Sequence, residues 1–358
     1  MLKFEETAWI PGLITTGVGS LPHTSPDDAV DLILGSLKNA PHAPQLSRAD
    51  PREQMWIQFS ENLPRFRVNL ETLTYHFDTS GNPELEVEAF YTKYLEVMEG
   101  GPADDFFVSQ QYGRGIHVLL ERLSSLGQKM KFIKVQVTGP LSFALTVGDE
   151  NRKPIFYHPL FKDVAIKAMG LKAIWLIEKF RPFAEHIIVF LDEPSLSAYG
   201  SSAFLGVSAS DVIEALDDVV SMVSQQGALA AIHCCGNTDW GLIMDTSIRA
   251  INFDAVDYME TMSIYPQKLN DFLHKGGVLA WGAVPNTPRI MEEDSQTVIA
   301  RIRKGVDLLT SNGIDRAALT QRLLITPACG CAGLSVHETG KVYQIMNELD
   351  SMKISNIF

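Results

Sequence analysis

Strand-like and helix-like segments alternate along this chain, and that alternation is the feature that most restricts its fold. The apolar runs typical of buried strands cover 14–22, 132–142, 186–195, 227–235, 253–261, 276–284 and 323–331. A weaker run lies at 66–75, where the pattern fits a β-hairpin equally well. Segments of helical periodicity lie between them, at 160–180, 208–227 and 297–313. Eight strand candidates with intervening helices predict an α/β protein, a single (β/α)8 TIM barrel that spans residues 1–358 as one domain.

The length and spacing of these segments favour a barrel over other α/β folds. A chain of 358 residues is within the range of one α/β barrel. No glycine-rich fingerprint follows the first strand-like run, which disfavours a doubly wound dinucleotide-binding sheet. The stretch 27–126 is long for two βα units, so we expect an insertion in the N-terminal third.

The charge balance excludes some classes of partner. The formal net charge is −13, whereas binding to nucleic acid or to an anionic membrane requires a basic face. The apolar runs are too short for a transmembrane helix, and the start, MLKFEETAWIPG, lacks the apolar core of a signal peptide. We therefore expect a cytoplasmic protein with a small-molecule substrate and no nucleic-acid or membrane partner.

Polar residues, cysteines and one Gly-Pro pair lie at the ends of most of the strand-like runs. They are Ser20, Gly139, Pro140, Asp192, Glu193, His233, Cys235, Glu260, Asn286 and Cys329. In a parallel barrel the carboxyl ends of all strands meet at one mouth, where active sites are built. Their common placement therefore predicts a functional site at that mouth.

The cysteines form two tight clusters, Cys234–Cys235 and Cys329–Cys331, and none lies elsewhere. Side chains two residues apart on a strand share a face, so His233 and Cys235 point together while Cys234 points toward the helical layer. Thiolate, imidazole and carboxylate are the ligands that zinc prefers. The pattern predicts a zinc site that includes His233, Cys235 and a cysteine of the second cluster. Cys331 could be that ligand or a packed residue.

Six motifs resemble the C-terminal, catalytic half of cobalamin-independent methionine synthase over most of the chain. They are GVGSLP (17–22), VTGPLSF (137–143), LDEPSL (191–196), HCC (233–235), DAVDYMET (254–261) and TPACG (326–330). The resemblance implies a zinc-dependent methyltransferase of methionine biosynthesis. Such an enzyme activates a thiol substrate, here homocysteine, as a zinc thiolate for methyl transfer.

The resemblance implies four zinc ligands, namely His233, Cys235, Glu260 and Cys329. For Glu260 the residues alone also allow a carboxylate at the protein surface. For Cys234 they favour simple packing, because free cysteine is often fully buried.

The resemblance also implies a substrate-binding site on the other side of the mouth. Val18, Gly19 and Ser20 would bind the amino-acid thiol together with Asp192, which would also be a catalytic residue. A carboxylate suits the ammonium group of such a substrate, and a serine hydroxyl with nearby N–H groups suits its carboxylate. From the residues alone, Asp192 could instead cap the turn that follows it.

The expected methyl donor follows from where the sequence departs from this family. The folate-associated N-terminal half of the family is absent, and the family's D-x-H after the seventh strand reads WGAVPNTPR (281–289). Asn286 stands in the place of that histidine, and asparagine cannot relay a proton to a leaving group. The motif HCCGNT is more similar to the corrinoid:thiol methyltransferases of the uroporphyrinogen decarboxylase superfamily. A methyl group on a corrinoid leaves Co(I), which needs no proton, so we expect a methylcorrinoid donor on a corrinoid protein.

Two other functions stay open at this stage. A decarboxylase of the uroporphyrinogen type needs arginines for several propionates, and this N-terminal part has scattered ones at positions 48, 52, 65 and 67. It also leaves the cysteine clusters without a role. A non-catalytic zinc- or corrinoid-binding protein would instead hold a structural zinc in a closed shell of four ligands.

Overall fold

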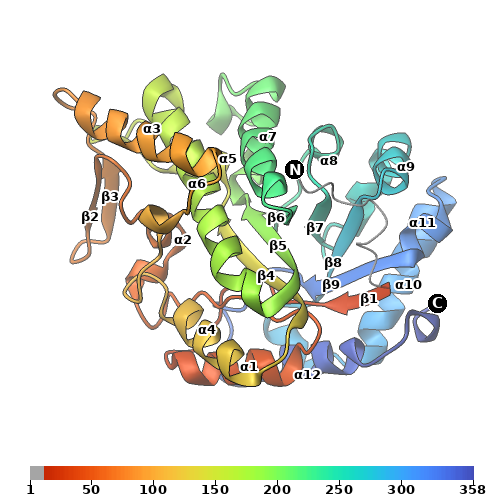
Figure 1. Cartoon of the computed structure of the whole chain (residues 1–358). Coiled ribbons are helices and arrows are strands. Elements are labelled where there is room, and N and C mark those ends of the chain that lie inside the picture. Colours follow the sequence, from red (N-terminus) through yellow and green to blue (C-terminus); the bar gives the residue numbers. More distant parts are fainter. Residues whose placement is uncertain (1–11) are drawn as a thin grey trace.

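Seven parallel strands curl into a sheet at the centre of the molecule (Figure 1), in a computed structural model that describes residues 12–358. The strands are β1 (Gly12–Thr15), β4 (Met130–Thr138), β5 (Ala184–Asp192), β6 (Leu229–Cys234), β7 (Ala250–Asp254), β8 (Val278–Val284) and β9 (Arg322–Pro327). Their order is β1-β9-β8-β7-β6-β5-β4, so the first strand of the chain lies beside the last. Residues 1–11 lie outside the described residues. They include most of MLKFEETAWIPG, the stretch from which no signal peptide is expected.

An irregular segment, 39–45, fills the gap between β1 and β4. On one side the amide of Lys134 in β4 donates to the carbonyl of Pro41 at 2.9 Å. On the other side the amide of Gln45 donates to the carbonyl of Gly19 at 3.1 Å. The isolated bridges of this segment to both neighbours are parallel. It therefore takes the eighth strand position and closes the barrel.

The sequence does not predict this eighth position. Pro41 and Pro44 interrupt the segment, and proline has no N–H to donate to a sheet, so the pattern does not resemble a strand. The weaker run at 66–75 forms instead a two-stranded antiparallel hairpin, β2 (Phe66–Asn69) and β3 (Thr74–Phe77), outside the barrel. The hairpin interpretation of that run is the right one.

The helices lie around the outside of the sheet (Figure 1). They are α1 (Pro26–Ser36), α2 (Met55–Gln58), α3 (Glu84–Met98), α4 (Arg114–Leu126), α5 (Pro140–Thr146), α6 (Pro159–Phe180), α7 (Ala209–Gln225), α8 (Trp240–Ile243), α9 (Pro266–His274), α10 (Ser295–Ser311), α11 (Arg316–Gln321) and α12 (Val336–Asp350). A short 3-10 turn, η7 (Met259–Ile264), follows β7. Serine or aspartate caps begin α7, α10 and α12.

Alternate side chains of the strands pack on opposite faces of the sheet. The barrel interior holds a small apolar core made of Ile14, Ala40, Phe132, Ile188, Phe190, Leu229, Ala231, Ala250, Val278, Ala280 and Leu324. The residues between them, such as Val189, Ile232 and Phe253, belong to the larger core between the sheet and the helices. This alternation determines which residues near the strand ends face the mouth of the barrel.

The insertion predicted in the N-terminal third comes directly after the segment 39–45. Because it follows the carboxyl end of a barrel strand position, it belongs to the mouth side of the barrel. It contains α2, the hairpin β2–β3 and α3, which Figure 1 shows at the edge of the molecule opposite α9 and α11. Lys172 of α6, fully buried, donates to the carbonyls of Glu61 and Phe107, both at 2.7 Å, and so attaches the insertion to the barrel.

The structure confirms the predicted α/β barrel with its N-terminal insertion and corrects the bounds of two strands. The expected run 14–22 continues well past β1, which ends at Thr15. The expected run 253–261 is too far along the chain, because β7 ends at Asp254 and the chain then turns into η7. In the part of the chain that the structure describes, no helix has the length and apolar character needed to cross a membrane. That residues 1–358 form one domain stays a prediction.

Candidate metal centre at the barrel mouth

Three of the predicted ligands meet at the mouth of the barrel. The ligand atoms of His233, Cys235 and Cys329 all lie within 4.8 Å of one another. His233 is the second-last residue of β6, Cys235 follows the end of that strand, and Cys329 follows β9 by two residues. The Sγ atom of Cys329 lies 3.5 Å from Nε2 of His233. Residues almost 100 positions apart in the sequence thus form one compact donor set.

A buried amide holds the imidazole of His233 from below. Nδ1 of His233 lies 2.6 Å from Oδ1 of Asn252 in β7. The amide nitrogen of Asn252 in turn donates to the carbonyl of Ala280 at 2.9 Å and to Oγ1 of Thr326 at 2.7 Å. Asn252 and Thr326 are fully buried, and His233 is 4% exposed. The imidazole ring therefore has little freedom to turn.

The two thiols of the group differ in acidity. Hydrogen bonds from Cys329 and His233 lower the pKa of Cys235 to about 4. The same contact with Cys235, together with burial, raises the pKa of Cys329 well above its usual value. At neutral pH the pair therefore shares one negative charge, which the surroundings favour on Cys235.

The other two cysteines pack away from the mouth. Cys234 is fully buried in the outer core and its thiol donates to the carbonyl of Gly236 at 3.5 Å. Cys331 is 2% exposed and belongs to the same core. Burial raises the pKa of each to about 12. Both are buried thiols, and neither belongs to the donor group.

Glu260, the predicted fourth ligand, is not brought into this group. It lies exposed on η7, where it lines a hollow of about 570 Å³ together with residues of α10. Its role as a ligand stays a prediction, and it would require η7 to move toward the mouth.

Asp254 is a carboxylate that the structure places next to Cys235, and the sequence interpretation missed it. It ends β7, and since Phe253 pairs with Cys234, Asp254 is the neighbour of Cys235 across the two strands. One oxygen accepts the amides of Val256 and Asp257 at 2.7 and 3.0 Å. Burial, and to a smaller extent the charge of Cys235, raises its pKa. Ending the strand at position 254 instead of 261 would have revealed it.

Asp192, predicted to bind substrate, ends β5 directly beside His233 in the sheet register. Its Oδ1 atom is buried and makes no hydrogen bond to any described residue. Burial raises the pKa of Asp192, and the positive charge of Lys134 opposes that rise. A buried carboxylate oxygen without a donor is suited to receive a cationic ligand group.

Lys134 is a second residue that the sequence interpretation missed. It lies fully buried in the barrel below the mouth, where Nζ donates to the carbonyl of Val18 and to Oε1 of Gln136 at 2.9 Å. Nζ also lies 4.4 Å from the ring centre of Phe190. Burial lowers its pKa to about 8, against the favourable charge of Asp192. A lysine within the apolar run 132–142 is unusual and could have marked this position in the sequence. Only the barrel shows that its side chain faces inward.

Gly19 and Ser20 lie where the loop after β1 meets the loop after β9. The amide of Cys331 donates to the carbonyl of Ser20 at 2.8 Å. A side chain at Gly330 would collide with the hydroxyl of Ser20, so glycine there lets the two loops approach closely. Asn286 holds the same loop, since its amide nitrogen donates to the carbonyl of Gly330 at 3.2 Å. The predicted substrate residues are thus next to the loop that carries Cys329.

Glu193 joins the strand ends around the mouth. Its backbone amide donates to the carbonyl of His233 at 2.8 Å, and its fully buried carboxylate accepts the amides of Leu141 and Ser142 at 2.9 and 2.7 Å. Burial raises its pKa to about 7. The Glu of the D-E-P motif therefore fixes the start of α5 against β5 and β6, while its Asp neighbour stays free of such bonds.

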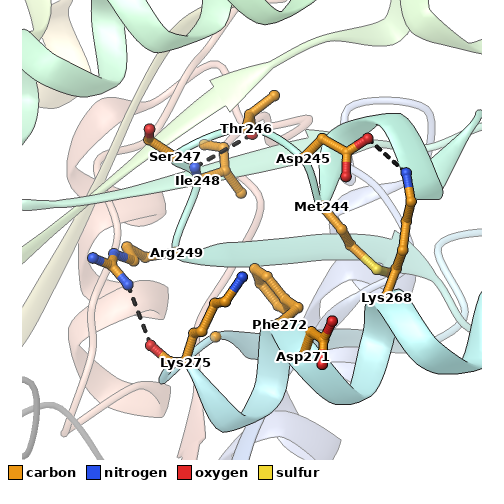
Figure 2. Close-up of a pocket in the computed structure, with 11 residues that line it drawn as sticks. Met244, Asp245, Thr246, Ser247, Ile248, Arg249, Lys268, Asp271, Phe272 and Lys275 are labelled. Carbon is orange, nitrogen blue, oxygen red and sulfur yellow. Dashed lines mark hydrogen bonds and ion pairs between the residues drawn. The ribbon is translucent and has the colours of Figure 1, made fainter.

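A second hollow, of about 330 Å³, lies at the opposite end of the barrel. Figure 2 shows it between the turn before β7 and helix α9, with Arg249, Lys268 and Lys275 among its lining residues. Lys268 is paired with Asp245 at 2.6 Å, and Arg249 donates to the carbonyl of Lys275 at 3.3 Å. These are surface contacts at the amino ends of the strands, where barrels carry stability rather than chemistry.

Comparison with known proteins shows the fold and leaves the activity open. No family model and no curated protein matches the sequence. Among solved structures, the chain is similar to a methyltransferase from Methanosarcina mazei, at 15% sequence identity and a TM-score of 0.52. The match covers 95% of this chain and 94% of that one. At this identity the likeness shows a common barrel fold.

Proposed function

We propose that this protein is a zinc-dependent methyltransferase that methylates a thiol, with homocysteine as the acceptor. The observation that carries the proposal is the group of His233, Cys235 and Cys329, three zinc-type ligands within 4.8 Å at the mouth of a barrel. Three protein ligands with a further position for substrate are typical of catalytic zinc sites. The motifs that resemble cobalamin-independent methionine synthase and the methyltransferase of similar fold support the same reaction.

The donor set fits zinc in charge and in geometry. One thiolate, one thiol that can lose its proton, and one imidazole lie within the reach of a single ion. When bound, zinc would lower the pKa of a substrate thiol while leaving its sulfur nucleophilic. Asp254 would be available as a fourth ligand on the metal-facing side of β7.

The residues across the mouth supply the means to orient an amino-acid thiol. The free oxygen of Asp192 would accept the substrate ammonium, and Lys134 beneath it offsets the cost of a buried carboxylate. Ser20 and the nearby backbone would receive the substrate carboxylate. Because Asp192 and His233 are neighbours in the sheet, a bound amino acid would place its thiol over the ligand group.

We further propose a methylcorrinoid, carried by a corrinoid protein, as the methyl donor. Asn286 donates to the carbonyl of Gly330 and offers no titratable proton at the position where the resemblance predicts a histidine. A donor whose leaving group needs no proton, as Co(I) does, is compatible with such a site. A methyl-folate donor would require a proton source that this residue cannot supply.

The test is a methyl-transfer assay on purified, zinc-analysed protein. Methylcobalamin and methyl-folate would each be combined with homocysteine and with thiols that lack the amino or carboxyl group. We expect one zinc per chain and transfer from methylcobalamin to homocysteine. A chain that binds no zinc under reducing conditions would refute the metal site.

X-ray absorption at the zinc edge separates catalysis from a structural role. Added homocysteine is expected to contribute one new sulfur ligand. An unchanged shell of ligands would favour a non-catalytic zinc protein instead. A decarboxylase finds little support, since Arg52, Arg65 and Arg67 of the insertion pair with carboxylates of that same insertion.

A further inference from the structure

We propose that Asn252 is a positioning residue that fixes the tautomer of His233 and so determines that Nε2 is the nitrogen presented to the ligand group. Neither the cysteine and histidine motifs nor the resemblance assigns a role to this residue. Asn252 is fully buried in the middle of β7 and takes part in three hydrogen bonds to groups on β6, β8 and β9.

The orientation of the Asn252 amide follows from its surroundings. The carbonyl of Ala280 can only accept a hydrogen bond, so the atom of Asn252 that lies 2.9 Å from it must be the amide nitrogen. The second hydrogen of that nitrogen is used by Oγ1 of Thr326 at 2.7 Å. The opposite atom, which faces His233 at 2.6 Å, is therefore the carbonyl oxygen Oδ1.

The tautomer of His233 follows from that orientation. An amide oxygen cannot donate, so Nδ1 of His233 must carry the hydrogen of this contact. In the neutral ring Nε2 then has its lone pair free, and it points toward Cys329 at 3.5 Å. A flipped amide would place an N–H against Nδ1 and leave the Ala280 carbonyl without its donor. Burial of the Ala280 carbonyl makes the loss of that donor costly.

The same network restricts the ring in position as well as in protonation. Ala280 and Thr326 belong to the two strands beyond β7, so the imidazole is held through Asn252 by half of the barrel wall. Partners of this kind set the orientation and basicity of a histidine ligand, and their loss typically lowers metal affinity by roughly 10- to 100-fold. This consequence rests on the proposed function, whereas the tautomer does not.

The direct test is the metal-free wild-type protein labelled with 15N-histidine. Long-range 1H–15N correlation spectra distinguish a protonated Nδ1 from a protonated Nε2, and a His233→Gln variant identifies the signal. We expect Nδ1 to carry the hydrogen. A ring that carries hydrogen on Nε2 but none on Nδ1 overturns the proposal, whatever the protein binds and however any variant folds.

Three variants test the consequence for the metal. Asn252→Leu, similar in size, removes the acceptor and is expected to mix the two tautomers and to weaken zinc binding about 10- to 100-fold in competition with a chelator. Asn252→Asp keeps an acceptor toward Nδ1 but loses the donor to the Ala280 carbonyl, so it is expected to keep the tautomer and to retain more of the zinc affinity than Asn252→Leu. Thr326→Val removes only one partner of the amide and should leave Nδ1 protonated.

The outcomes separate the two proposals. If wild type shows Nδ1–H but binds no zinc, the positioning role stands and the proposed function fails. If Asn252→Leu keeps both the wild-type tautomer and the wild-type zinc affinity, Asn252 has no positioning role. If Asn252→Asp loses as much affinity as Asn252→Leu, the residue supports the fold only, and the proposal is wrong.

Discussion

In each cysteine cluster, one thiol lies at the barrel mouth and the other lies in the core between the sheet and the helices. At the mouth, Cys235 and Cys329 share a site with His233, and the pKa of Cys235 falls to about 4. In the outer core, Cys234 and Cys331 are surrounded by apolar side chains, and burial raises each pKa to about 12. The adjacent residues Cys234 and Cys235 thus have opposite chemistry because the strand turns them to different environments, whereas Cys329 and Cys331 are separated by the loop that follows β9.

The largest expected difference between the two regions concerns metal retention. Cys235→Ser and Cys329→Ser each remove a soft ligand, so zinc affinity should fall by more than the roughly 100-fold typical of an outer-shell change, and methyl transfer should be abolished. Cys234→Ser should keep a full equivalent of zinc and most of the turnover. Equal zinc loss in all three variants, measured by metal analysis after dialysis, would contradict the difference between the faces.

The second-largest expected difference is in the reactivity of the mouth and core thiols in the metal-free protein. The hydrogen bond from Cys329 and the charge of the site lower the pKa of Cys235, so its alkylation by iodoacetamide should be nearly independent of pH from about 6 to about 9. Cys234 and Cys331 titrate near 12 and should react at least about 100-fold more slowly at neutral pH. Peptide mass spectrometry of timed samples measures all sites together, and bound zinc should protect Cys235.

The two candidate carboxylates offer a matched comparison of a strand end with an exposed turn. Asp254→Asn should weaken zinc binding about 10-fold, because this carboxylate lies beside Cys235. Glu260→Gln, on exposed η7, should change the zinc affinity less than about twofold. A larger effect at Glu260 would favour the ligand that the resemblance implies, and with it a movement of η7.

The smallest expected effect is the loss of stability when a buried core thiol is removed. Cys331→Ala leaves a small cavity in the outer core and should lower the free energy of unfolding by about 1 kcal/mol, without changing zinc content. Urea denaturation at constant m-value would measure this loss. A change in metal content in the same variant would show that Cys331 takes part in the site after all.

The sequence predicted most of the barrel because its signals are local. Each of the seven stronger apolar runs overlaps one strand of the sheet, although the runs 14–22 and 253–261 share only positions 14–15 and 253–254 with their strands, and the helix expected at 160–180 is α6. The segment 39–45 was missed since its prolines hide a strand position that backbone bonds on both sides create. The end of β7 was placed too late because apolar and acidic residues continue past Asp254 into η7.

The site was predictable to the extent that side-chain alternation along a strand is predictable. The common face of His233 and Cys235 follows from a two-residue period, and the structure brings Cys329 to them. Asn252, Asp254 and Lys134 were not found, because a polar residue within an apolar run gains its meaning only from its neighbours on adjacent strands. Those neighbours depend on register, which a single strand does not reveal.

The sequence by itself therefore determined the barrel, the opposite faces of the doubled cysteine and the kind of metal chemistry that its donors suit. The resemblance already implied Cys329 as the ligand from the second cluster, and the tertiary structure brings this cysteine into the group. Only the tertiary structure placed Asp254 rather than Glu260 next to Cys235. It also supplied the amide that holds His233. The physical reason is that composition and periodicity act along the chain, whereas a donor set depends on distances between strands that lie far apart in sequence.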